Sequence, residues 1–380
     1  MNKRLGEITG SSFDSVDLNY KGARMRAFDE IPTIVIDEKE KKFECLRDFN
    51  LYDDIEEDNN IKYYNPIDST SCAKLDKLNN NLNSNHINLF TERMYSSFLR
   101  QYSQSFVISP VGLLSCVALL YRGSSNNTLI RSELGDKVNL FNKLYETLQI
   151  KQNIWNLCFI SDNYDLNDMY TSYANNLGKI ISIKSINHAN NIIKKLKYFT
   201  DLYRFLEGIT LVSLSKFNVV LKYEFTKMNN KLVQHNGTHY YYVDEDIECL
   251  EMELVDHRLR FGICKGLFTF DVIDYLKETT FKTIILPTIV MKSKFGLIQL
   301  FKQLGVTFEK VDYSEILTHS TQSCDLNDII GECLFSFTGK GNNKIVSKNK
   351  SNLIFNCNGS FTYYIRCVKY NTLLCIGQKN

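Results

Sequence analysis

The chain has 380 residues, of which 44% are hydrophobic and 23% are charged. A chain of this length forms one large domain or two ordinary ones, and it buries a core without help from disulfides or metals. Its 45 Lys and Arg residues against 43 Asp and Glu residues give a formal charge of +2. This balance excludes a general nucleic-acid binder and an acidic solvating protein.

The 11 cysteines are scattered and form no C-x-x-C pair, which argues against a disulfide framework and a zinc site. Cys116 in LLSCVALL and Cys375 in LLCIG lie in apolar runs, where a free thiol packs like a small hydrophobic group. The N-terminus has no apolar region of a signal peptide, and no run has the length of a membrane span. We therefore expect a cytoplasmic protein, with export by a route that needs no standard signal peptide as the alternative.

Residues 1–84 are predicted to form an acidic, Asn-rich and partly disordered extension. Residues 37–60 are dense in charge, and the polar stretch 76–86 is predicted to be a linker. The short apolar run 33–36 favours one edge strand. We interpret the acidic cluster at 53–58 as a solvated run and not as a metal site.

Regular patterns begin near residue 87. Phe90, Met94, Phe98 and Tyr102 recur at i, i+4 spacing and predict an amphipathic helix. The run SFVISP then predicts a short strand that ends at Pro110, and the next residues, 111–123, predict a buried helix that ends at a glycine.

The second half of the chain is richer in predicted strands. Helices are predicted over 191–208 and 293–305, and strands over 209–225 and 282–287. The C-terminal segment SFTYYIRCVKYNTLLCIGQ predicts a hairpin that turns at residues 369–371. Helices first and sheet-rich segments later indicate a mixed α+β domain over residues 85–380.

Candidate catalytic and metal-binding patterns are weak. His235 and His239 have the i, i+4 spacing of a zinc protease helix, but Asn236 and Gly237 predict a turn on a hairpin, and no Glu accompanies His235. No serine lies in a G-x-S-x-G motif, and no complete phosphate-binding loop occurs. We therefore expect a protein that is not an enzyme and that has no cofactor and no metal.

A lysine-rich segment stands out near the C-terminus. Residues 338–352 contain Lys340, Lys344, Lys348 and Lys350 and no acidic residue. The segment is interpreted either as a solvated basic loop between strands or as an exposed loop that contacts a partner, which would then be anionic.

Four stretches in this order resemble the serpin family over residues 87–380. They are FVISPVGLLSCVALLYRGSSNNT (106–128), ITLVSLSKFNVVLKYEF (209–225), TIILPTIVMKSKFGLIQLFKQLGVTFEKVDYSEI (283–316) and FTYYIRCVKYNTLLCIGQ (361–378). The resemblance implies a serpin fold, with N-terminal helices packed on a large mixed sheet, smaller sheets beside it, and a shortened middle near 191–205. The composition resembles that of the poxvirus members, which implies a viral protein that meets host proteins in the host cytoplasm.

The resemblance also implies a mechanism. An inhibitory serpin presents an exposed loop that a serine or cysteine protease cleaves, and the acyl-enzyme is trapped when the loop inserts into the large sheet. The hinge of this loop must be small and uncharged, because its side chains become buried in the sheet.

Here the loop region is about 338–358, and its hinge departs from the family pattern. The hinge residues are Gly339, Lys340, Gly341, Asn342, Asn343 and Lys344, with no alanine run after them. About a dozen inserted residues, or ~40 Å of strand, reach Leu353 and leave little chain for an exit strand. Gly112, Ser213 and Leu221 replace the family's serine, asparagine and tryptophan at positions that matter for sheet opening.

The hypothesis favoured by these departures is a serpin-like, non-inhibitory scaffold that binds a protein partner, and we expect it to be a monomer. The alternative is a working inhibitor of a serine or cysteine protease, cleaved within Lys350, Ser351, Asn352, Leu353, Ile354 and Phe355. A weaker third hypothesis is a polyanion binder that uses the lysine-rich segment. No specific nucleic acid and no membrane is expected as a partner.

Overall fold

The computed structural model describes residues 75–122, 153–174, 177–202, 208–229, 231–306, 308, 313, 316–318, 324–345 and 351–380. The described residues all belong to one unit, residues 34–380. The predictions of an edge strand at 33–36 and of a solvated acidic cluster at 53–58 lie outside the described residues.

The described helices are α2 (Leu75–Gln101), α3 (Pro110–Arg122), α6 (Asp168–Ala174), α7 (Ile186–Lys195) and α8 (Ile298–Gln303), with a 3-10 helix at Phe270–Tyr275. The prediction of a linker at 76–86 is wrong, because the backbone of these residues is helical and belongs to α2. The predicted boundary at residue 84 also falls inside this helix. The stretch contains no glycine or proline, so its asparagines weaken a helix without breaking it.

Sixteen described strands form three sheets. They are β1 (Phe106–Ile108), β2 (Ile154–Ser161), β3 (Lys179–Ile183), β4 (Ile209–Tyr223), β5 (Thr226–Met228), β6 (Lys231–His235), β7 (Thr238–Val243), β8 (Glu248–Glu253), β9 (Leu259–Lys265), β10 (Lys277–Thr280), β11 (Thr283–Pro287), β12 (Ile289–Gly296), β13 (Leu326–Asn343), β14 (Ile354–Asn356), β15 (Phe361–Cys367) and β16 (Thr372–Lys379). The five-stranded sheet has the order β12-β13-β4-β2-β3, the seven-stranded sheet β1-β16-β15-β9-β8-β7-β10, and the four-stranded sheet β14-β11-β6-β5. The mixed α+β architecture is confirmed.

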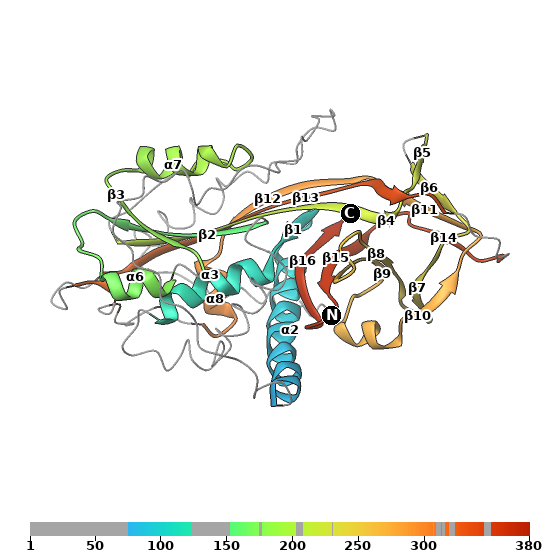
Figure 1. Ribbon diagram of the computed structural model, residues 1–380, viewed down its shortest axis with the longest axis horizontal. Helices are drawn as coiled ribbons and strands as arrows, with labels where there is room; N and C mark the ends of the chain where they lie inside the picture. Colours follow the sequence, from blue (N-terminus) through green and yellow to red (C-terminus); the bar gives the residue numbers. More distant parts are fainter. Residues whose placement is uncertain are drawn as a thin grey trace, which may run out of the picture. The chain divides into compact units, whose positions relative to one another are not determined.

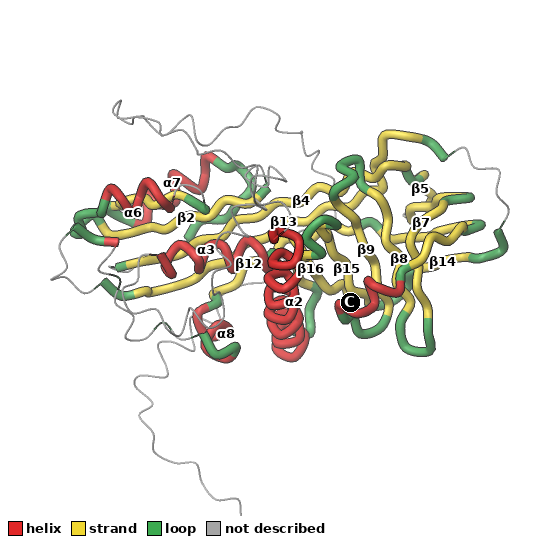
Figure 2. The backbone as a smooth tube through the Cα atoms, turned by 60° about the horizontal axis from the view of Figure 1, so that its bottom comes forward, coloured by secondary structure: helices red, strands yellow, loops and turns green. Residues whose placement is uncertain are grey.

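The five-stranded sheet separates two apolar clusters, as the period of two in a strand requires. Leu211 of β4 packs in the main core with α3, whereas its neighbour Val212 packs in a second cluster with α7. Figure 1 shows α7 on one face of this sheet and α3 on the other. Against the seven-stranded sheet, α2 lies beside β16 (Figure 2). Tyr95 of α2 donates a hydrogen bond to the Gln378 side chain of β16 at 2.7 Å.

Four predictions can be compared directly with these bounds. The strand over 209–225 and the C-terminal hairpin are confirmed by β4 and by the β15–β16 pair. The helix predicted over 191–208 is wrong at residues 196–202, because α7 ends at Lys195 and Lys197 takes a left-handed conformation with φ of 61°; residues 203–207 lie outside the described residues. The helix predicted over 293–305 is shorter, because residues 293–296 complete β12 and only α8 is helical.

The described cysteines are all free and buried, as expected for reduced core thiols; they are Cys116, Cys158, Cys249, Cys264, Cys324, Cys333, Cys357, Cys367 and Cys375. Among the helices that the structure describes, none is both long and apolar enough to span a bilayer.

An ion pair lies inside the seven-stranded sheet. Arg366 of β15 binds both carboxylate oxygens of Glu251 on β8, at 2.9 and 2.6 Å, and the Glu251 side chain is 2% exposed. Tyr364 donates to the same carboxylate. A buried carboxylate depends on such partners, because desolvation without a counter-charge is costly.

Replacing Arg366 with methionine should lower the free energy of unfolding by about 3–5 kcal/mol, because buried Glu251 would lose the counter-charge that compensates its desolvation. Urea unfolding measures this change. The exposed pair of Lys194 and Asp201, 3.1 Å apart, offers the control, and Lys194→Ala should cost less than about 1 kcal/mol. Equal losses in the two variants would contradict a stabilising role for the buried pair.

Candidate functional site

Strand β13 ends in the segment that the sequence predicts to be a hinge. The strand lies inside the five-stranded sheet, antiparallel to β12 and parallel to β4. Its regular pairing with β4 runs from Asp328 to Phe337, after an irregularity between Leu326 and Asp328. Beyond Phe337 the ladder is irregular, and it resumes with Gly341 opposite Leu221 and Asn343 opposite Tyr223. The predicted hinge therefore continues the strand and remains attached to β4.

Two glycines allow this irregular pairing. Gly339 has a φ of 75°, in the left-handed region that favours glycine. A Cβ on Gly341 would lie 2.3 Å from the backbone nitrogen of Glu224, so only glycine permits this approach of the two chains. The backbone amide of Glu224 donates to the Asn343 carbonyl, and that of Phe225 to the Gly339 carbonyl, both at 2.9 Å.

The polar hinge side chains point to solvent. Lys340, Asn342, Asn343 and Lys344 are exposed. The Asn343 amide donates to the Lys222 carbonyl at 3.1 Å, which adds a tie between the end of β13 and β4. The hinge is thus a short stretch whose glycines face the protein and whose amides and lysines face water.

Some of the predicted scissile residues are exposed, and others lie in or beside β14. Asn352 is exposed, but the Leu353 carbonyl accepts a hydrogen bond from Lys282 at 2.7 Å. Ile354 begins β14, which pairs in parallel with β11, and Phe355 is fully buried. Lys350 lies outside the described residues, and Ser351 is partly exposed. Only the part of this region before Leu353 is therefore free of sheet contacts in the described chain.

An open cavity of about 310 Å³ adjoins the hinge. Asn342 and Asn343 line it together with Lys222 of β4, Glu253 of β8 and His257 from the following turn. Lys222 binds Glu253 at 2.6 Å, and this hydrogen bond raises the pKa of Lys222. Sequence reasoning missed this site because its residues come from three strands that only the fold brings together.

The departures Gly112, Ser213 and Leu221 are buried in the structure. A Cβ on Gly112 would lie 2.9 Å from the Ser213 hydroxyl, so the glycine of α3 permits a close approach to β4. Leu221 forms an isolated bridge with Leu254 and is 1% exposed. The small residues Gly112 and Ser213 face each other, a pairing that the sequence alone did not reveal.

The two histidines do not form a metal site. His235 ends β6 and His239 lies in β7, and these strands belong to different sheets, so the predicted hairpin is wrong although the turn at Asn236 is present. His239 is buried and lies 2.6 Å from the Gln234 side-chain oxygen. Within the described ranges, no group of three or more potential ligands is positioned to hold a metal ion.

Burial of His239 predicts a loss of stability in acid. Burial lowers the pKa of His239 from 6.5 to about 4, so the unfolded chain binds more protons between these values. The free energy of unfolding should fall as the pH drops from 6.5 to 4, by up to about 3 kcal/mol. His239→Gln should flatten this dependence in thermal unfolding, and the exposed His235→Gln should leave it unchanged. A wild-type slope in His239→Gln would refute this assignment.

Replacing Gly341 with alanine should loosen the hinge, because the new methyl group cannot fit against Glu224. We expect a loss of about 1–3 kcal/mol in stability and faster cleavage by thermolysin within 338–358. Asn342→Ala, at the exposed neighbouring position, is the control and should be cleaved at the wild-type rate. Identical digestion of the two variants would show that the close approach does not hold the hinge.

No family model and no curated protein matches the chain. Similar solved structures include native protease nexin-1 with heparin, with a TM-score of 0.69 and 15% identity, covering 79% of this chain and 99% of that chain. Mouse protein-Z dependent protease inhibitor has a TM-score of 0.68 and 15% identity, and the match covers 79% of this chain and 97% of that chain. A tumour suppressing serpin has a TM-score of 0.68 and 12% identity, and the match covers 78% of this chain and 98% of that chain.

At these identities the likeness concerns the fold alone. It extends over almost the whole of each solved chain and agrees with the three sheets described above. The hinge at the end of β13 and the loop before β14 thus lie in a protein that has the serpin fold.

Proposed function

We propose that this protein is a non-inhibitory, serpin-like scaffold that binds a protein partner and does not trap proteases by loop insertion. The observation that carries this proposal is the short connection between β13 and β14. Strand β13 ends at Asn343 and β14 begins at Ile354, so ten residues, 344–353, connect them.

This connection is too short for both insertion and cleavage at an exposed bond. A strand placed between β4 and β13 along their regular pairing would match the ten residues from Asp328 to Phe337, or ~33 Å. The ten residues 344–353 also span ~33 Å when fully extended, so insertion would use the whole connection and leave no exposed residue after the cleaved bond. Cleavage farther along the chain would have to occur within β14, where Phe355 is fully buried.

The hinge chemistry supports the same conclusion. Insertion would move Asn342, Asn343 and Lys344 from water into the sheet, between the cluster that contains α3 and the cluster that contains α7. A buried ammonium or amide without a partner is costly. In the present arrangement the Asn343 side chain is already used to hold the strand end to β4.

The exposed loop is proposed as the contact surface. Lys340 and Lys344 are exposed beside the polar cavity, which suits an acidic or polar surface on a protein partner. We further propose that the protein acts as a monomer without enzymatic activity or cofactor, inside the cytoplasm, and that it is of viral origin with a host protein as its partner. Incubation with proteases distinguishes this scaffold from the alternative, a working inhibitor of a serine or cysteine protease.

Incubation with trypsin-, chymotrypsin- and caspase-like proteases should give no SDS-resistant adduct. We expect cleavage within 344–352, and the cleaved protein should have a Tm no higher than that of the intact protein, because no strand is added. Gel electrophoresis, mass spectrometry and thermal unfolding measure these outcomes. Lys344→Ala is the matched control, because it removes a trypsin site near the strand end while keeping the loop length.

An adduct that survives SDS, or a marked rise in Tm after cleavage, would overturn the proposal in favour of a working inhibitor. In that case the cleaved bond, read by mass spectrometry, would fall before Leu353.

A further inference from the structure

Two tyrosines form an aromatic pair at one edge of the seven-stranded sheet. Tyr242 lies in β7, and Tyr275 ends the 3-10 helix that precedes β10, the edge strand beside β7 (Figure 1). Their ring centres are 5.6 Å apart, and the angle between the ring planes is 32°. Tyr275 is 59% exposed and Tyr242 is partly exposed, so the pair presents ring surface to solvent.

A carboxylate is fixed beside the pair. The Tyr242 hydroxyl donates to one oxygen of Asp244 at 2.7 Å. The backbone amides of Asp246 and Ile247 donate to the other oxygen, at 2.9 and 2.7 Å. Asp244 is nevertheless exposed, so its carboxylate is held in place and can still accept from a further donor.

The surface around the pair is mainly negative. Residues 244–246 are three consecutive acidic residues in an exposed turn, and Asp271 and Asp274 are exposed on one edge of the 3-10 helix, where residues three apart line up. Lys277 lies opposite Tyr241 in the β10–β7 ladder and therefore belongs to the other face of the sheet. A cation that approaches the tyrosine pair is therefore attracted by nearby carboxylates.

A neighbouring tyrosine on the same face of β7 shows how a cation binds here. Tyr240 is two residues from Tyr242, so the two side chains share a face. The guanidinium of Arg260 lies 4.3 Å from the centre of the Tyr240 ring and donates to its hydroxyl at 3.2 Å. The same group lies 2.6 Å from a carboxylate oxygen of Glu253. One guanidinium thus uses a tyrosine ring and a carboxylate together, which its planar shape favours.

The Tyr242–Tyr275 pair offers the same two kinds of partner, with two rings in place of one. Asp244 supplies the carboxylate beside the first ring, and Asp274 precedes the second ring in the chain. Within the described part of the chain, the cation–π contacts involve the rings of Tyr198, Tyr223, Tyr240, Phe355 and Tyr370 and neither ring of the pair. The pair is therefore open to a cation from another molecule.

We propose that Tyr242 and Tyr275, with Asp244 and Asp274, form a binding site for an arginine in a basic segment of a partner protein. The guanidinium stacks on the rings and donates to a carboxylate, and further basic residues of the segment face the acidic turn. Lysine fits less well, because its ammonium is strongly hydrated and has no planar fork. The site goes beyond the proposed function, because the loop proposed there is basic and suits an acidic partner surface.

Fluorescence anisotropy of a labelled arginine–glycine peptide with the full chain tests this site. The peptide should bind the wild-type protein at low ionic strength, and its lysine–glycine counterpart should bind about threefold more weakly. Tyr275→Ala should weaken binding of the arginine peptide about fivefold, whereas Tyr275→Phe, which keeps the ring, should bind it like the wild type. Tyr275 is exposed, so neither change removes a core side chain.

Asp274→Asn and Asp165→Asn are matched variants, because each removes one exposed carboxylate and only Asp274 adjoins the pair. Asp274→Asn should weaken binding about threefold, and Asp165→Asn, before α6, should leave it unchanged. Wild-type affinity in both Tyr275→Ala and Asp274→Asn would overturn the site. An equal loss in Asp165→Asn would also overturn it, since attraction between net charges would then explain the binding.

Sedimentation velocity of the wild-type chain checks a different occupant, a second copy that binds through its lysine-rich segment. We expect no self-association. Self-association that Asp274→Asn abolishes would overturn the assignment to a partner protein. These measurements involve no protease, so their failure is distinguishable from a failure of the proposed function.

Discussion

The parallel pairing of β13 with β4 is the contact on which the rest of the structure depends. It extends from Leu326 to Asn343 with one irregularity near each end, and it joins segments that lie more than a hundred residues apart in the chain. The alternating side chains of these strands supply both apolar clusters, one beneath α3 and one beneath α7. Because parallel strands need long connections, the whole middle of the chain must fold correctly before this pair can form.

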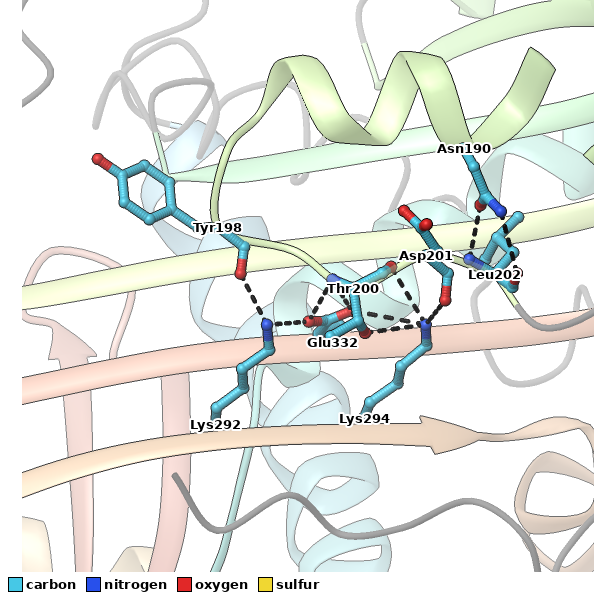
Figure 3. A network of polar contacts seen from close by, with 8 residues as sticks. All are labelled: Asn190, Tyr198, Thr200, Asp201, Leu202, Lys292, Lys294 and Glu332. Atoms are coloured by element: carbon cyan, nitrogen blue, oxygen red, sulfur yellow. Dashed lines mark hydrogen bonds and ion pairs between the residues drawn. The ribbon is translucent and has the colours of Figure 1, made fainter. Parts of the chain in front are cut away.

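Buried ion pairs join strands within each of the two larger sheets. Glu251 and Arg366 form a bidentate pair inside the seven-stranded sheet, and Glu332 meets two lysines on the five-stranded one. Such groups add little net stability compared with apolar residues, but each tolerates few alternative positions. Glu332 differs in that it accepts a hydrogen bond from the backbone amide of Thr200, so its position also determines that of Tyr198–Leu202, a segment without regular structure (Figure 3).

The end of β13 links this framework to function. Gly339 and Gly341 let β13 remain attached to β4 after its regular pairing stops. Ten residues separate the end of β13 from the start of β14. The ten residues between these two strand ends leave little chain for a large rearrangement.

The sequence by itself determined the fold class, the strand β4, the closing hairpin and the buried free thiols, because these follow from local periodicity and composition. The order of four serpin-like stretches also led to the prediction of a hinge at residues 339–344, which the structure places at the end of β13. Only the tertiary structure decided that Phe355 is buried, since β14 pairs with a distant strand, and that Tyr198–Leu202 crosses the sheet. The roles of Glu332 and Glu253 arise from contacts between residues far apart in the chain, and no local pattern encodes such contacts.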